Sequence, residues 1–128
     1  PAFALALHQL GAFPNWRRPN IIWVDFAGAT AQLEQMQVLV DAAVRLADFA
    51  GEDRAFTPHL TIGRVKKEAS ARERTALGEV LQREQSRSTA QMAVFAARFT
   101  VDSIAFVQSD LHPSGPIYTM LASYSLNG

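Results

Sequence analysis

The chain has 128 residues, enough for one domain with a core of its own, and its 12 basic residues balance its 12 acidic ones. Because there is no net charge, the field of the whole molecule will not attract nucleic acid from a distance, so any contact with nucleic acid must be local. Cysteine is absent and the three histidines lack metal-ligand spacing, which excludes disulfides and thiol nucleophiles and predicts that no metal is bound.

The chain begins with a strand pattern that is followed by a loop. Residues 2–7 alternate between large apolar side chains and alanine, which predicts a half-buried strand. Residues 11–19 contain glycine and proline and are expected to break this strand. The loop holds four residues that could stack on bases and hold phosphates, namely Phe13, Trp16, Arg17 and Arg18. A packed loop with arginines on its surface is an equally good interpretation.

A strand and a long helix are predicted next. Residues 21–26 are apolar on both parities apart from Asp25, which predicts a central strand covered on both faces. From about residue 30 to residue 50 apolar positions recur at helical spacing, and Gly51 is placed to end that helix. We expect the apolar stripe of the helix to pack in the core, and residues 52–57 to form a polar link.

Residues 56–64 form the stretch with the most chemical content. On a strand, His59 and Thr61 share one face, while Leu60 and Ile62 lie on the other face and can be buried. The imidazole can move a proton near neutral pH, and the hydroxyl can donate to a phosphate oxygen that becomes more negative during a reaction. Arg64 has the opposite parity, so it reaches the same ligand only if the strand ends or twists near residue 63.

A second helix is predicted from Ser70, which has capping-box spacing to Glu73, to an end near Gln85. Residues 86–91 are then expected to be a polar linker. Lys66 and Lys67, together with the three arginines at positions 17, 18 and 64, are candidates for a local basic patch that contacts RNA. A solvated charged face is the ordinary alternative.

The end of the chain predicts paired strands. Residues 99–101 and 104–106 differ in parity, which indicates a bulge or twist near residue 102, and residues 118–126 alternate cleanly. The connection over residues 110–116 is typical of a turn-rich loop, with His112 exposed to solvent. We expect His8 to be structural or exposed to solvent as well. The mixed order of strands and helices favours an α+β fold over a doubly wound parallel sheet.

The run from His59 to Arg64 resembles the second His-x-Thr-x-x-Arg signature of the 2H phosphoesterases, specifically the RNA 2',3'-cyclic phosphodiesterase family, also called 2'-5' RNA ligases. The segments at residues 11–15, 17–19 and 21–24 resemble the part of this family that lies between its two signatures. Ser109-x-Leu111 and Gly115-Pro116-x-Tyr118 resemble its C-terminal hairpin. The resemblance covers essentially the whole chain, in the family's order.

The resemblance implies an α+β fold with antiparallel sheets in two lobes and helices packed outside. It implies a metal-independent cyclic phosphodiesterase that opens a 2',3'-cyclic phosphate on RNA or a nucleotide to a 2'-phosphate, and that in reverse makes a 2'-5' bond. It requires no cofactor. His59 and Thr61 would be the catalytic residues, while phosphate or RNA would be bound by Arg64, Arg17, Arg18, Trp16 and Phe13.

One part of the family pattern is missing, because a first His-x-Thr signature does not occur. His8 is followed by Gln9-Leu10, with leucine in place of the hydroxyl. Since the chain also starts at Pro1 with a strand pattern, we expect residues 1–128 to be a single domain that is truncated at its N-terminus and inactive by itself. Which proton His59 transfers is therefore left open.

Several expectations concern the surroundings of the protein. We expect the intact protein to be a monomer, whereas a truncated sheet edge would promote self-association. No run of about 18 apolar residues and no signal peptide is visible, so a cytoplasmic protein without membrane contact is the default. Two alternatives to an enzyme stay open: a non-catalytic lobe that binds RNA ends or nucleotide phosphates, and a structural domain with an inert His-x-Thr strand.

Overall fold

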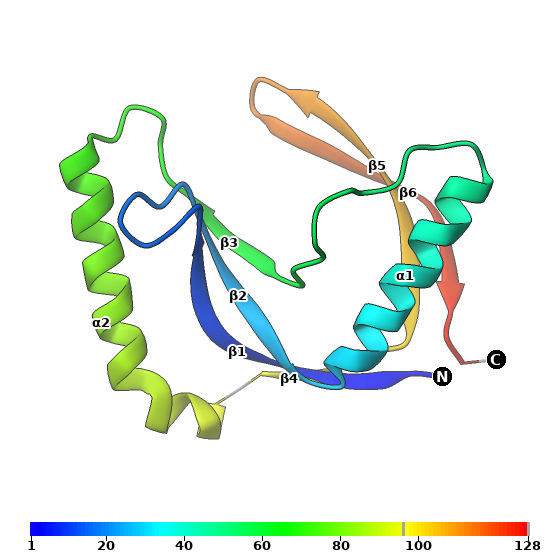
Figure 1. Ribbon diagram of the computed structural model, residues 1–128, viewed down its shortest axis with the longest axis horizontal. Coiled ribbons are helices and arrows are strands. Elements are labelled where there is room, and N and C mark those ends of the chain that lie inside the picture. Colours follow the sequence, from blue (N-terminus) through cyan, green and yellow to red (C-terminus); the bar gives the residue numbers. More distant parts are fainter. Residues whose placement is uncertain (96, 128) are drawn as a thin grey trace. The chain divides into compact units, whose positions relative to one another are not determined.

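The computed structural model describes residues 1–95 and 97–127, and the side chains of all of these except residues 88–95. Its elements are shown in Figure 1. They are β1 (Phe3–Phe13), β2 (Ile21–Gly28), α1 (Thr30–Leu46), β3 (Leu60–Arg64), α2 (Ala71–Phe95), β4 (Arg98–Val101), β5 (Ser103–His112) and β6 (Gly115–Ser125). β1 pairs with β2, β2 with β3 and β5 with β6 in antiparallel fashion, so the predicted α+β class is confirmed. The chain divides into two compact units, Leu5–Arg98 and the two ends of the chain.

The four-stranded sheet has the strand order β3-β2-β1-β4, and β2, β3 and most of β1 belong to the larger unit. β2 lies between β3 and β1, so its predicted central position is confirmed. It is not covered equally on both faces as predicted, because Ile22 and Val24 are buried whereas Ile21 and Trp23 on the other face are half-buried. β1 continues through Gly11 to Phe13, so the predicted break at Gly11 is wrong. The strand continues because Gly11 pairs with Trp23 of β2 and needs no turn conformation.

A bulge in β1 explains the position of the first histidine. Leu7 pairs with Phe26 and Leu10 with Val24, so two residues of β1 face one residue of β2. The carboxylate of that residue, Asp25, accepts a hydrogen bond of 2.6 Å from the Gln9 main chain. The same oxygen lies 3.2 Å from His8 Nδ1, and half of the His8 side chain is exposed. His8 is therefore placed at a strand irregularity, in line with the structural role expected for it.

α1 ends at Leu46, four residues before the predicted end at residue 50. The main-chain N–H of Phe49 donates to Val44 O at 3.1 Å, and that of Asp48 donates to Arg45 O at 3.1 Å. This is the Schellman arrangement, with Asp48 at φ +63° in the left-handed position that glycine commonly takes. The prediction failed because it assigned the stop to Gly51.

α2 begins as predicted but is much longer. The Ser70 main chain donates to Glu73 Oε2 at 2.7 Å, and the Glu73 main chain donates to Ser70 Oγ at 3.2 Å, which confirms the capping box. The helix continues to Phe95, so the predicted end near Gln85 and the linker at residues 86–91 are wrong. Residues 82–95 contain no glycine or proline, and polarity alone does not end a helix.

The Arg74 side chain links the start of α2 to the segments that precede β2 and follow β3. Its guanidinium donates to the main-chain oxygens of Pro19 at 3.1 Å, Lys66 at 2.9 Å and Ala69 at 3.2 Å. Farther along the helix, a Cβ on Gly78 would lie 1.8 Å from Trp16 O. α2 therefore lies so close to the loop between β1 and β2 that a side chain at position 78 would collide with the main chain of the loop. Figure 1 shows the helix along one side of this sheet.

The C-terminal unit contains the hairpin of β5 and β6. The strands pair from Ser103↔Ser125 to His112↔Gly115, which leaves a turn of two residues, Pro113 and Ser114. The predicted loop over residues 110–116 is thus largely strand, and His112 is exposed as expected. β4 and β5 belong to different sheets, so the parity change near residue 102 marks a strand end. No helix among the described residues is long and apolar enough to cross a membrane.

Candidate active site

His59 lies directly before β3, at the edge of the larger sheet. β3 pairs with β2 through Val24↔Leu60 and Trp23↔Thr61, which puts Thr61 on the same face as Trp23. Leu60 is 48% and Ile62 57% exposed, so the expectation that these two side chains are buried is wrong. The reason is that β3 is an edge strand with a neighbour on one side only.

A register shift in β3 changes the position of Arg64. Ile22 pairs with Gly63 and Trp23 with Thr61, so Ile62 is an extra residue in the ladder. Beyond it, Arg64 pairs with Ile21, which shares a face with Trp23. The bulge therefore brings Arg64 to the face that carries Thr61, although strict alternation would put it on the opposite face. The sequence predicted that Arg64 could reach the same ligand as His59 only if the strand ended or twisted near residue 63. The bulge is an irregularity of this kind.

Aromatic side chains surround the imidazole of His59. The ring of Phe13 packs edge-on against it at a centroid distance of 5.1 Å, and Trp23 lies 6.1 Å away. Phe13 and Trp23 also contact each other at 5.0 Å. The Trp23 indole lies so close to Gly11 that a Cβ there would be 2.2 Å from the ring. Gly11 is thus part of the site, since its missing side chain lets the indole lie beside His59.

One hydrogen bond determines which nitrogen of His59 is available. Nδ1 lies 2.6 Å from the main-chain oxygen of Thr57. Because a carbonyl oxygen can only accept, Nδ1 carries the hydrogen and Nε2 has the lone pair in the neutral ring. His59 is also exposed to solvent. The neutral ring can therefore take a proton at Nε2, and the protonated ring can give one from the same atom.

A hollow of about 820 Å³ adjoins His59, and we call it the histidine pocket. Most of its lining is apolar, and its lining residues include Phe13, Ile21, Leu33, Glu52, Phe56 and His59. The main-chain N–H of Arg54 donates to the Glu52 carboxylate at 3.1 Å and its guanidinium does so at 3.3 Å. These two bonds lower the pKa of Glu52. The histidine pocket thus has an apolar wall beside the imidazole of His59, which can transfer protons.

Comparison with known proteins assigns the chain to a family. The family model described as 2'-5' RNA ligase superfamily matches residues 1–113. The chain belongs to the 2'-5' RNA ligase superfamily. It is 34% identical over 119 residues to an RNA 2',3'-cyclic phosphodiesterase of Aeropyrum pernix, with 93% of this chain covered, and 28% identical over 130 residues to one of Aquifex aeolicus, with 98% covered. The chain spans about 62% of the length of each of these curated relatives.

A solved structure supports the fold of this member of the 2'-5' RNA ligase superfamily. The crystal structure of TT0787 of Thermus thermophilus matches 99% of this chain with a TM-score of 0.63 at 26% sequence identity. The match covers 62% of the TT0787 chain. The family resemblance inferred from the residues around His59 is therefore confirmed, and so is the general fold that it implies.

The remaining residues predicted for the site separate into two groups. Phe13 lies against His59, whereas the Trp16 main chain packs on α2 and Arg17 and Arg18 line a different hollow beside that helix. Within residues 1–95 and 97–127, no group of three or more His, Cys, Asp or Glu side chains could hold a metal ion. The structure thus brings Phe13 into contact with His59, and the pairing of β3 with β2 puts Thr61 and Arg64 on the face of the sheet that carries Trp23.

Two residues beside His59 were not predicted as site residues. Trp23 was assigned to a central strand and Gly11 to a strand break, and both otherwise entered only as parts of segments that resemble the family. Their adjacency to His59 depends on which strands pair, which no local pattern reports. The signal that could have found Gly11 is its position on a strand opposite a tryptophan, because glycine on a strand often marks a close approach.

Proposed function

We propose that this protein is an RNA 2',3'-cyclic phosphodiesterase and that His59 transfers one of the two protons of the reaction. The observation that carries the proposal is the hydrogen bond from His59 Nδ1 to the Thr57 main-chain oxygen, which leaves Nε2 for proton transfer. The Trp23 ring lies beside His59, and the pairing of β3 with β2 puts Thr61 and Arg64 on the same face of the sheet as Trp23. Similarity to proteins described as RNA 2',3'-cyclic phosphodiesterases supports the substrate class.

In the proposed reaction, water attacks the phosphorus of the cyclic phosphate and the bond from phosphorus to O3' breaks. A general base takes a proton from the water, and a general acid gives a proton to O3', which leaves a 2'-phosphate and a 3'-hydroxyl. His59 Nε2 suits either step. The Thr61 hydroxyl would donate to a non-bridging phosphate oxygen, and the guanidinium of Arg64 would balance its charge.

The second proton carrier is the open part of this mechanism. In the family that the sequence resembles, it comes from a first His-x-Thr signature, which this sequence lacks. His8 is held at a bulge beside Asp25, and His112 lies at the tip of the hairpin in the other compact unit. We therefore propose that neither of these two histidines is the partner of His59, and that the 128-residue chain alone has no turnover.

The test is turnover of a nucleoside 2',3'-cyclic phosphate, with the product identified by chromatography and with EDTA added in a parallel reaction. The intact protein should form only the 2'-phosphate, at the same rate with EDTA. Formation of the 3'-phosphate, loss of activity to EDTA or absence of turnover would contradict the proposal. Binding of a nucleotide 2'-phosphate without turnover would indicate the non-catalytic binding lobe instead.

The same assay should be run on the 128-residue chain, with its mass in solution measured in parallel. Multiple turnover by a monomer of these residues would contradict the requirement for a second His-x-Thr and would return His8 to consideration. Turnover only by a dimer would indicate that two copies of His59 face each other across one cleft.

A further inference from the structure

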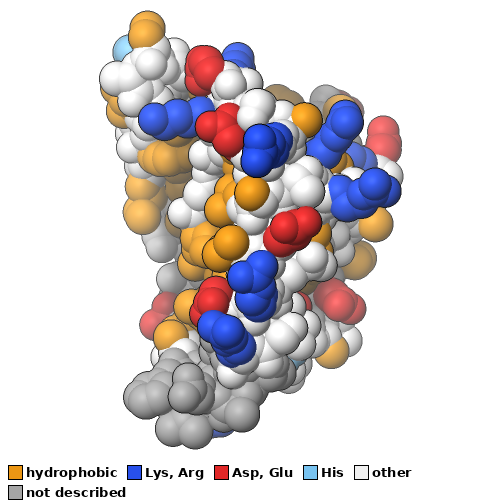
Figure 2. All heavy atoms as spheres, turned by 90° about the vertical axis from the view of Figure 1, so that its left-hand side faces the viewer, with side chains coloured by type: hydrophobic (Ala, Val, Ile, Leu, Met, Phe, Trp, Pro, Cys, Tyr) orange, Lys and Arg blue, Asp and Glu red, His pale blue; other side chains and the backbone are white. Residues whose placement is uncertain are grey.

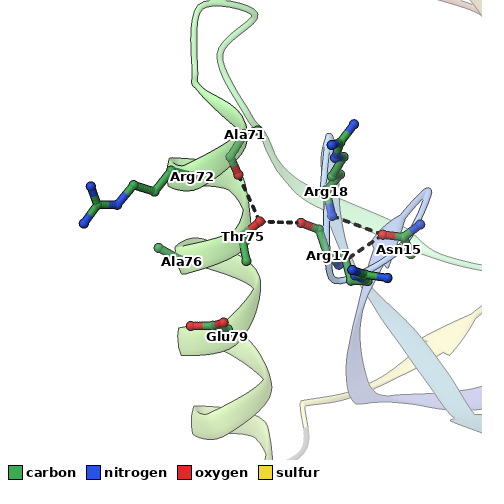
Figure 3. A pocket seen from close by; sticks show the side chains of 8 residues that line it. All are labelled: Asn15, Arg17, Arg18, Ala71, Arg72, Thr75, Ala76 and Glu79. Atoms are coloured by element: carbon green, nitrogen blue, oxygen red, sulfur yellow. Dashed lines mark hydrogen bonds between the residues drawn. The ribbon is translucent and has the colours of Figure 1, made fainter.

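A second hollow, of about 730 Å³, lies between α2 and the loop that joins β1 to β2. We call it the arginine trough, after the residues Arg17, Arg18 and Arg72 in its lining. Figure 3 shows the Arg72 side chain extending from α2 on the side away from the loop, while Thr75 lies on the side of the helix that faces Arg17 and Arg18. No residue of the trough lines the histidine pocket, so the two hollows are separate features of the same compact unit.

The walls of the trough are held in place by hydrogen bonds. The Asn15 side-chain oxygen accepts from the main-chain N–H groups of Arg17 at 3.0 Å and Arg18 at 3.1 Å. The Thr75 hydroxyl lies 3.0 Å from the main-chain oxygens of both Arg17 and Ala71, as Figure 3 shows. The main chain that carries the two loop arginines is thus fixed to the helix that carries Arg72.

The charges of the trough are available for a ligand. Arg17, Arg18 and Arg72 are all exposed, and among the described residues none of them lies within ion-pair distance of a carboxylate. Glu79 also lines the trough, so the lining carries three positive charges and one negative charge. Figure 2 shows that the side of the molecule on which α2 lies carries both basic and acidic side chains. The positive excess is therefore local to the trough.

The shape of the trough favours an extended anion. The guanidinium group of Arg72 lies on the other side of α2 from those of Arg17 and Arg18, so the three do not converge on one point (Figure 3). The lining residues of α2 run from Ala71 to Glu79, which is about 12 Å of helix at 1.5 Å per residue. A single phosphate could not contact all three arginines, whereas successive phosphates of a strand could.

We infer that the arginine trough binds the phosphodiester backbone of single-stranded RNA, away from the end that is processed. The choice of RNA over other polyanions rests on the proposed function. In this arrangement α2 and the loop at residues 15–18 hold the strand, while His59 acts at a terminus. Each arginine that neutralises a phosphate should release counterions, so binding should weaken with salt with a slope of about 0.7 per contact for a single strand.

The experiment measures the affinity of the intact protein for a fluorescently labelled single-stranded RNA over a series of salt concentrations. Arg72→Gln should weaken binding and lower the salt slope by about 0.7, and the triple change of Arg17, Arg18 and Arg72 to glutamine should lower it by about 2. Arg83→Gln is the matched control, because Arg83 is exposed on the same helix but outside the trough. Its slope should equal that of the unmodified protein.

The outcomes separate this inference from the proposed function. An unchanged slope in the triple variant, or an equal loss in Arg83→Gln, would overturn the trough as an RNA site, even if the unmodified protein turns over a mononucleotide 2',3'-cyclic phosphate. A lowered slope in a protein without such turnover would support the trough and reject the proposed function. Poly-glutamate that binds with the same dependence on Arg72 would overturn the assignment to RNA, because the ligand would then be an acidic polypeptide.

Discussion

The two hollows of the larger unit differ in how their chemistry is supplied. The histidine pocket has an apolar lining and one imidazole, whose orientation is set by the Thr57 oxygen and by the rings of Phe13 and Trp23. The arginine trough is polar, and only its main chain is held in place. Proton transfer needs a group that is held in one orientation, as His59 is. Long side chains on a fixed main chain can instead neutralise a charged ligand without holding it in one geometry.

The largest effect should come from His59→Ala, which removes the proton carrier and affects the histidine pocket alone. Because general acid or base catalysis contributes about 10²- to 10⁴-fold, turnover of a cyclic phosphate by the intact protein should fall by that amount. The salt slope of RNA binding should stay the same. His112→Ala is the control, and an equal loss of turnover in that variant would contradict the assignment.

Gly78→Ala should disturb the contact between α2 and the loop that forms the arginine trough. An added Cβ would lie 1.8 Å from the Trp16 oxygen, so α2 and the loop must separate. We expect a loss of about 3 kcal/mol in the free energy of unfolding, at the upper end of the usual cost of overpacking, and weaker RNA binding. Urea denaturation gives the first quantity. A variant as stable as the parent would show that the helix and the loop are not in contact.

Gly11→Ala tests the histidine pocket by the same kind of change. The added Cβ would lie 2.2 Å from the Trp23 ring, which can move at some cost, so we expect a loss of about 2 kcal/mol and a displaced His59. Gly63→Ala is the matched control, because a Cβ there meets nothing within 4 Å. Trp23 fluorescence and urea denaturation should change in the first variant and not in the second.

Thr61→Val should weaken phosphate binding without unfolding the sheet. Valine keeps the branched shape and removes the hydroxyl, so the loss of one hydrogen bond to a charged group should cost about 1.5 kcal/mol, or roughly tenfold in affinity for a nucleotide 2'-phosphate. Isothermal titration calorimetry measures this affinity. An affinity equal to that of the parent would make Thr61 a structural residue of β3.

The smallest effect concerns the helix that carries the trough. The Ser70 main-chain N–H and its hydroxyl lower the pKa of Glu73 below its ordinary value of 4.5. A lowered pKa contributes stability above that ordinary value, and this contribution is lost as the pH falls through the pKa of the folded state. Glu73→Gln should therefore melt slightly lower than the parent at pH 7, and the gap should close below about pH 4.5. A gap that is constant with pH would contradict the charge effect.

Local patterns were sufficient for some features and failed for others. The Ser70 and Glu73 cap is set by residues near one another in the sequence, and it could be predicted from it. The position of Arg64 depends on an extra residue at Ile62 in its pairing with β2, which strict alternation cannot reveal. The contact of Phe13 and Trp23 with His59 likewise requires the strand order, which is a property of the whole sheet.

The errors in element ends have a similar cause. Gly11 and Gly51 were taken as breaks because glycine often marks them, yet Gly11 lies within β1 and Asp48 takes the left-handed position after α1. β5 and β6 extend to a turn of two residues because their pairing outweighs the turn propensity of residues 110–116. For β1, β5 and β6 a partner strand decided the outcome, whereas the end of α1 is set by hydrogen bonds to its own last turn.

The bonds made by Arg74 have a practical consequence for labelling. Its partners in the segment after β3 are main-chain oxygens, so the side chains of Lys66 and Lys67 take no part in that anchor. Since the chain contains no cysteine, a single Lys67→Cys change would create one thiol for a fluorophore on a segment whose path is already fixed. Such a reporter would sit next to the start of α2, and it could follow ligand binding while the three arginines of the trough stay unmodified.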